Sequence, residues 1–173
     1  TPGDADSLFK ITQPGSYYLT GNITGVAGRH GVEIATSGVS LDLMGFTLTG
    51  VAGSLDGVSV TVNNSQNISV VNGSVRSWGD EGVDLGTMPS RGCRVEQILA
   101  VSNAGNGIAV GLATTVTNCS AYINTGHGIA TNSGCAISMC TTYANSDNGI
   151  NTGAGCSVSA CSSGYCCPAC SAP

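Results

Sequence analysis

Apolar and polar residues alternate with a period of two along most of this chain, in short segments that each follow a glycine. A Gly-Val or Gly-Ile pair opens these segments at six glycines, which are Gly31, Gly57, Gly82, Gly107, Gly128 and Gly149. Successive pairs are 26, 25, 25, 21 and 21 residues apart. Alternation of this period is typical of a strand with one buried face. The pattern therefore predicts a strand that recurs at a regular interval.

A second set of apolar positions follows each glycine pair, always with a spacing of two, three and two residues. In the first repeat these positions are Leu41, Leu43, Phe46 and Leu48. Two strands joined by a bend that holds one extra residue produce this spacing, so each repeat should contain three strands. No segment shows the apolar period of an amphipathic helix. We therefore expect an all-β, single-domain parallel β-solenoid, in which about six coils over residues 31–163 stack on one another.

The two ends of the chain depart from the repeat. Residues 1–30 hold the two apolar segments 9–12 and 17–20, and the Pro14-Gly15 pair between them suits a tight turn. We expect this part to form a hairpin or half-coil that caps the N-terminal end of the solenoid. Residues 164–173 form a cysteine-rich tail outside the repeat.

The opening of the chain resembles a known family. The segments Leu-Phe-Lys-Ile-Thr-Gln-Pro-Gly-Ser-Tyr-Tyr-Leu at 8–19 and Gly-Val-Ser-Leu-Asp-Leu-Met-Gly-Phe at 38–46 look like those of secreted bacterial right-handed parallel β-helix repeat proteins. Those proteins share the pectin-lyase-like fold, and the later Gly-Ile repeats agree with it. The resemblance implies a right-handed β-helix and an extracellular location. It implies no activity, because this fold serves polysaccharide lyases, glycoside hydrolases and phage tailspikes alike.

Equivalent residues of successive coils lie one above another in a solenoid. The residue before each anchor glycine forms one such row, made of His30, Asp56, Glu81, Asn106, His127 and Asn148. Another row, which consists of Asn103, Asn124 and Asn145, is expected to bond the backbone at a bend.

Charge gathers in the early coils. We interpret Asp80, Glu81 and Asp84, with Arg76 and the single tryptophan Trp78, as candidates for binding a carbohydrate or an ion such as Ca²⁺. The simpler alternative is a solvated acidic face.

Catalysis is the weakest interpretation of these residues. Neighbouring strands would hold Asp56 and Glu81 about 5 Å apart, a separation that suits a pair of glycosidase carboxylates. Polygalacturonase-like enzymes would further need several motifs, of which only Gly-His-Gly is present, at His127. Lyase-like enzymes need a basic residue near their calcium ion, and the only lysine, Lys10, lies in the expected cap. The motifs of both classes are thus incomplete, and no glycine-rich phosphate loop or Ser-His-Asp set occurs; zinc binding stays open only at the Cys-x-x-Cys of the tail, Cys167 and Cys170.

Eight of the nine cysteines lie beyond Glu96 in the C-terminal half. Cys119, Cys140 and Cys161 form one inward row, and Cys135 and Cys156 another. Stacked cysteines fall within disulfide reach, although parallel side chains strain the bridge, so both free thiols and bridges remain open. In the tail, Cys166, Cys167 and Cys170 are candidates for local or intermolecular disulfides. This cysteine content favours an oxidising, extracellular compartment.

Composition bears on the partners. Five basic against ten acidic residues argue against nucleic-acid binding, and no apolar stretch is long enough to span a membrane. Beyond Glu96 only Asp147 is charged, so little opposes association of this half. We therefore expect a secreted structural protein that assembles with itself end to end into a filament or surface layer. The alternative is a polysaccharide-binding or polysaccharide-degrading module. An ice-binding role ranks below both, because threonine is scattered.

Overall fold

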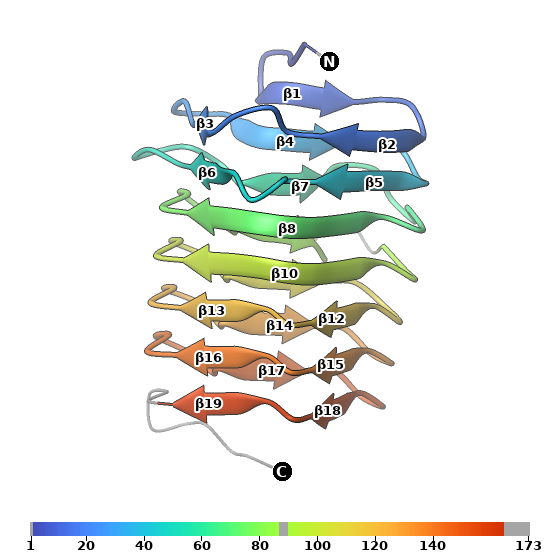
Figure 1. Ribbon diagram of the computed structural model, residues 1–173, viewed down its shortest axis with the longest axis vertical. Coiled ribbons are helices and arrows are strands. Elements are labelled where there is room, and N and C mark those ends of the chain that lie inside the picture. Colours follow the sequence, from blue (N-terminus) through green and yellow to red (C-terminus); the bar gives the residue numbers. More distant parts are fainter. Residues whose placement is uncertain (1, 87–89, 165–173) are drawn as a thin grey trace.

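The computed structural model describes residues 2–86 and 90–164, and this part of the chain is a parallel β-solenoid of seven coils (Figure 1). No helix occurs in it. Each strand pairs in parallel with its equivalent in the next coil, so the coils stack along one axis with the N-terminus at one end. The predicted fold class is confirmed. No helix in the described part of the chain is long and apolar enough to cross a membrane.

One strand from every coil builds the first sheet, which we call sheet A. Its members in spatial order are β1 (Ser7–Ile11), β4 (His30–Ile34), β7 (Val58–Val60), β9 (Val83–Leu85), β11 (Ile108–Val110), β14 (Ile129–Thr131) and β17 (Ile150–Thr152). The anchor glycines lie at or just before these strands from β4 onward. An added Cβ on Gly57, Gly82, Gly107 or Gly128 would lie 2.5–2.7 Å from the next anchor's carbonyl oxygen. Close stacking of the backbone therefore explains the glycine.

The remaining strands build sheet B, in two columns separated by a bend. The first column is β2 (Gly15–Tyr18), β5 (Val39–Asp42), β12 (Thr115–Thr117), β15 (Ala136–Ser138) and β18 (Ser157–Ser159). The second column is β3 (Ile23–Thr24), β6 (Thr47–Thr49), β13 (Ser120–Tyr122), β16 (Thr141–Tyr143) and β19 (Ser162–Gly164). In the third and fourth coils both columns merge into β8 (Ser69–Arg76) and β10 (Arg94–Val101).

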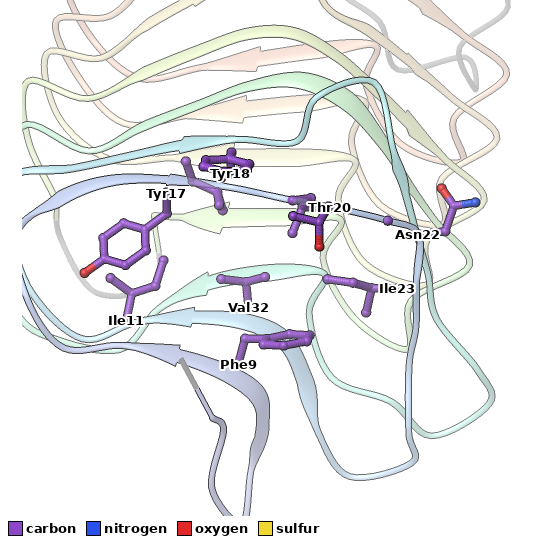
Figure 2. Close-up of a pocket in the computed structure, with 11 residues that line it drawn as sticks. Phe9, Ile11, Tyr17, Tyr18, Thr20, Asn22, Ile23 and Val32 are labelled. Carbon is purple, nitrogen blue, oxygen red and sulfur yellow. The ribbon is translucent and has the colours of Figure 1, made fainter.

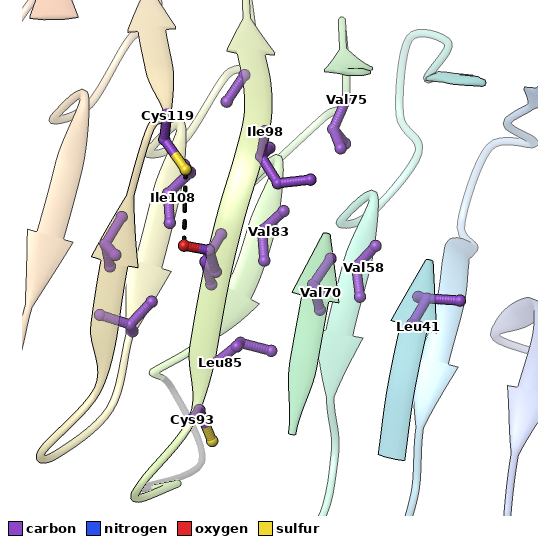
Figure 3. Packing of buried hydrophobic residues seen from close by; sticks show 14 of the residues in the cluster. Leu41, Val58, Val70, Val75, Val83, Leu85, Cys93, Ile98, Ile108 and Cys119 are labelled. Carbon is purple, nitrogen blue, oxygen red and sulfur yellow. Dashed lines mark hydrogen bonds between the residues drawn. The ribbon is translucent and has the colours of Figure 1, made fainter. Parts of the chain in front are cut away.

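The bend between the columns contains the extra residue that the two-three-two spacing predicts. That residue is left-handed in successive coils, with φ between 52° and 62° at Asn72, Gln97, Asn118, Met139 and Ala160. A left-handed residue turns the chain without shifting the inward positions on either side. The inward side chains of all three columns consequently meet in one continuous apolar core, seen in Figure 3.

The N-terminal segment differs from the expected cap. β1, β2 and β3 pair in parallel with β4, β5 and β6, so this segment forms a full coil instead of a hairpin or half-coil. The amide of Gly15 donates to the carbonyl of Gly38 in the next coil, at 3.0 Å, because the Pro14-Gly15 turn serves as a corner of the coil. The coil count therefore rises from six to seven. Of the predicted tail, only Gly164 lies within the described residues.

Candidate functional site

An acidic cavity of about 210 Å³ lies beside sheet A at the second, third and fourth coils, and we call it the acidic groove. Its lining residues are His30, Asp56, Ser59, Val60, Thr61, Asp80, Glu81 and Asp84. The structure therefore brings together the predicted candidates Asp56, Asp80, Glu81 and Asp84. Four carboxylates and one imidazole share this small space.

The row that precedes the anchor glycines has a structural role. Most of its side chains accept a hydrogen bond from the backbone amide of the equivalent residue in the next coil. His30 Nδ1 lies 3.2 Å from the Asp56 amide, and Asp56 Oδ1 lies 3.1 Å from the Glu81 amide. Further along, Asn106 Oδ1 accepts from the His127 amide at 2.8 Å. These bonds satisfy backbone donors at a corner of each coil.

Glu81 is the member of this row that departs from the arrangement. Its longer side chain accepts a bond from Asn106 Nδ2 at 2.9 Å instead of from a backbone amide. Burial, followed by the hydrogen-bonded neighbour Asp80 and the charges of Asp56 and Asp84, raises the pKa of Glu81 to about 8. Near neutral pH this carboxyl is therefore protonated for much of the time.

Glu81, Asp56 and Asp80 also suit a divalent cation in chemical terms. One carboxylate oxygen from each lies within 4.8 Å of the others. Oxygen ligands of this type are those that Ca²⁺ prefers. At the groove's edge His30 Nδ1 lies 3.2 Å from Asp56 Oδ2. Burial is the largest single influence on the pKa of His30 and lowers it, but the hydrogen bond and the charge of Asp56, together with other nearby carboxylates, raise the pKa above its ordinary value.

A second acidic group, not predicted from the sequence, lies at the N-terminal coils and is held by a lysine. Lys10 Nζ lies 2.7 Å from Asp4 Oδ2 and 2.8 Å from Glu33 Oε1. The Glu33 side chain is buried, and its Oε1 also accepts from Thr61 Oγ1. Lys10 thus balances part of the negative charge of this group. The in-register pairing of Lys10 with Glu33 could have revealed the contact, had residues 7–11 been recognised as a coil strand.

The other two candidates for binding a sugar lie away from the acidic groove. Trp78 is 1% exposed and belongs to the core, where its indole Nε1 donates to the Leu48 carbonyl at 3.2 Å. A buried ring cannot stack on a sugar, so that expectation for Trp78 is not met. Arg76 ends β8 on the other sheet and is exposed. Neither residue lines the cavity.

His127 and the asparagine row both support the backbone. His127 Nδ1 accepts from the Asn148 amide at 3.1 Å, and its Nε2 lies 3.1 Å from Asn151 Nδ2. Asn124 Oδ1 accepts from the amide and the side chain of Asn103, both at 3.0 Å. The buried ladder of Asn103, Asn124 and Asn145 is therefore present as expected.

Six cysteines fall within the described residues, and all six are free thiols in the structure. They are Cys93, Cys119, Cys135, Cys140, Cys156 and Cys161. Their sulfurs bond the backbone: Cys156 Sγ, for example, lies 3.2 Å from the Cys135 amide and 3.1 Å from the Asn132 carbonyl oxygen. Burial raises the pKa of the Cys135 thiol. The candidates Cys166, Cys167 and Cys170 lie outside the described residues.

The N-terminal end of the solenoid holds a second cavity, which we call the end pocket. It measures about 340 Å³, and Figure 2 shows its aromatic and aliphatic lining on β1, β2 and the following turn. Phe9 is 41% exposed and Tyr18 is 68% exposed, although both are large apolar side chains. Ile11, Tyr17 and Ile23 complete much of the wall. The apolar interior is therefore open at this end.

Comparison with known proteins identifies no relative: no family model, no curated protein and no solved structure matches the chain.

Proposed function

We propose that this chain is a structural β-solenoid that assembles with copies of itself, end to end, into a filament or surface layer. The observation that carries the proposal is the end pocket, where the core opens beside the exposed Phe9 and Tyr18. Solenoids need their terminal coils covered, because each coil buries its inner face only against its neighbours. A second copy would supply that cover.

The opposite end of the described chain supports the same proposal. β17, β18 and β19 each pair with one neighbour only among the described strands, and Val158 of β18 is 46% exposed. The last coil, from Gly149 to Gly164, has no charged residue. Exposed edge strands are ordinarily protected against pairing by charged residues or proline. Contacts between two different ends repeat without closing, so they generate a filament.

The location of this assembly belongs to the proposal as well. Secretion, a bacterial origin and kinship with the pectin-lyase-like family are supported by the opening segments 8–19 and 38–46. The high cysteine content agrees with an oxidising compartment.

A charge placed at one end tests the proposal. Val158→Lys would put an ammonium group in the junction, and we expect it to reduce the assembled fraction at least tenfold, because a buried unpaired charge is costly. Met139→Lys is the matched control, since Met139 is 56% exposed at a side corner of the solenoid. Sedimentation velocity over a range of concentrations gives the readout. A parent chain that stays monomeric at millimolar concentration would contradict the proposal.

A polysaccharide-acting module is the second candidate, and the acidic groove favours it. Glu81, with its pKa of about 8, is suited to act as a general acid beside further carboxylates. Incubation with neutral and acidic polysaccharides, followed by measurement of new reducing ends, tests this candidate. We would expect Glu81→Gln to abolish the release, and no release by the parent chain would refute hydrolysis.

A further inference from the structure

We infer that the end pocket receives the last described coil of a second copy in unbroken register, so that β17, β18 and β19 of one copy pair with β1, β2 and β3 of the next. This inference rests on the proposed assembly and names its contact surfaces. It follows from four features of the two ends, which are their registers, their side chains, their charge and their distance apart.

The registers of both ends match without any shift. On sheet A, Phe9 pairs with Val32 in the first step, and Ile129 pairs with Ile150 in the last step. Phe9 and Ile150 thus end the same inward row. In sheet B, Tyr17 and Val158 end a second row, and Ile23 and Ser163 end a third. One more identical step would place each terminal residue against its row partner in the second copy.

The side chains of the two ends are complementary in size. The first coil presents large residues, Phe9 and Tyr17, around a cavity of about 340 Å³. The last coil presents smaller inward residues on the same rows, including Val158 and Ser163. Stacking would cover exposed apolar surface on both sides, since Phe9 is 41% and Val158 is 46% exposed. Burial of apolar surface is the main driving force for such contacts.

Charge does not oppose this contact. The last coil from Gly149 to Gly164 is uncharged, and in the first coil the nearest cation, Lys10, is already paired with Asp4 and Glu33. No like charges would therefore meet. Because the last coil carries no charge, added salt should not weaken the assembly.

The two ends of one copy cannot meet each other. The first and last described coils lie at opposite ends of the rod (Figure 1), separated by six coil steps, or about 29 Å at the usual strand spacing. The last described coil therefore cannot reach the end pocket of its own copy. The last coil of a second copy, which carries the matching strands, is the occupant that fits.

The size of the contact sets its strength. A coil of 21 residues has a perimeter of about 70 Å, which encloses roughly a few hundred Å². The contact therefore lies near or below the lower end of specific interfaces, at roughly 1,000 Å² in total. We expect an assembly that grows with protein concentration and dissociates on dilution.

A native cysteine allows a direct test of the register. When the registers are extended by one or two residues before the paired strands, Cys161 ends an inward row that runs back through Cys140, Cys119, Ile98, Gly73 and Phe46 to Gly21 in the first coil. Gly21 lines the end pocket, and an added Cβ there would meet no atom within 4 Å. Gly21→Cys would thus lie against Cys161 of the second copy. Dibromobimane, which joins two nearby thiols with loss of two bromides, would link the copies covalently.

The experiment uses the full chain with Cys166, Cys167 and Cys170 changed to serine, to remove the tail thiols. With Gly21→Cys we expect a ladder of covalent multimers on a denaturing gel. Adding Cys161→Ser should reduce the ladder at least tenfold. Thr125→Cys, an exposed position at a side corner of the rod, serves as the matched control and should give no ladder. Ile23→Cys with Ser163→Cys tests the same register if Gly21→Cys itself prevents assembly.

Sedimentation of the same samples separates the two claims. If the parent chain assembles but the ladder is missing, or if only dimers form and persist with Cys161→Ser, the head-to-tail register is wrong while assembly stands. If the parent chain does not assemble at any concentration, both the register and the proposed function are overturned. Multimers that depend on both cysteines support the inference.

Discussion

At the scale of single residues, the row that precedes the anchor glycines repeats one interaction, in which a side chain accepts a hydrogen bond from a backbone amide. His30, Asp56, Asn106 and His127 differ in charge, yet each offers an acceptor that reaches the amide one coil further on. Glu81 is one methylene longer than aspartate and does not follow this geometry. Its carboxyl instead lies among other carboxyls, and its pKa rises to about 8. One residue therefore makes the groove sensitive to pH.

Glu81→Gln should change the pH dependence of stability. The folded pKa of about 8 exceeds the ordinary 4.5, so the folded state holds a proton that the unfolded state releases. This group therefore destabilises the fold progressively as the pH rises from 4.5 to 8. Gln cannot ionise, so the variant does not lose stability in this way. We expect its free energy of unfolding at pH 8 to exceed that of the parent by about 1 kcal/mol, after allowance for partial solvent screening. At pH 4.5 the difference should vanish.

Urea denaturation at both pH values measures this effect. Glu96→Gln is the control, because it removes the same charge from sheet B beside Arg94. The pKa of His30 is also raised, but His30 is present in both chains, so its own contribution cancels in the comparison. An equal effect of Glu81→Gln at pH 4.5 and pH 8 would show that the groove does not raise the pKa of Glu81.

Ile123→Asn should stabilise the fold. Ile123 is 54% exposed and has a φ of 59°, a left-handed conformation that a β-branched residue rarely adopts. Asparagine tolerates this conformation, so we expect a gain of about 0.5–1 kcal/mol in the free energy of unfolding. Val26→Asn, at a similarly exposed position without positive φ, should change stability by less than about 0.5 kcal/mol. A loss of stability with Ile123→Asn would contradict the corner geometry.

At the scale of strands, the sequence predicts what the repeat itself enforces. The period-two alternation and the anchor glycines identify the strands from β4 onward, because every coil must bury the same positions against its neighbours. The first coil escapes this reasoning, since it lacks the anchor and its Pro14-Gly15 corner imitates a hairpin turn. The spacing of apolar residues is also the same for the single long strands β8 and β10 as for the pairs of short strands in the other coils, so the sequence does not distinguish the two cases.

Burial of individual polar and aromatic residues was harder to predict. Trp78 lies on a stretch that resembles a loop, but its indole fills space that Gly25, Gly31 and Gly57 leave empty: an added Cβ at each would come within about 3.1 Å of the ring. The acidic groove is different. The repeat predicts the proximity of its carboxylates, because equivalent positions of successive coils stack close together independently of the conformation of the loops.

The asparagine ladder should contribute strongly to the stability of the later coils. Asn124→Ala would remove the acceptor of the Asn103 amide and the donor to the Ala100 carbonyl, both of them buried. Unsatisfied buried groups cost about 1–3 kcal/mol each, and we expect a total loss of about 3 kcal/mol in urea denaturation. Asn132→Ala, at an exposed turn, is the control and should have little effect. Equal losses for the two variants would show that Asn124 is not buried in a ladder.

At the scale of the whole molecule, the two halves of the rod differ in chemistry. The chain up to Glu96 carries all but one of the charged residues, about half of them in the acidic groove and around Lys10, whereas the chain beyond Glu96 has only Asp147. Both ends expose apolar residues of the same inward rows, Phe9 at one and Val158 at the other. Matching rows of exposed apolar residues on the first and last described coils, with little charge near one of them, suit the proposed longitudinal stacking.

Electron microscopy of the purified full chain, imaged at rising protein concentration, tests end-to-end assembly most directly. The account predicts unbranched filaments, one rod wide, that lengthen with concentration, and their loss with Val158→Lys but not with Met139→Lys. Single short rods at every concentration, or rods that join side by side, would contradict it.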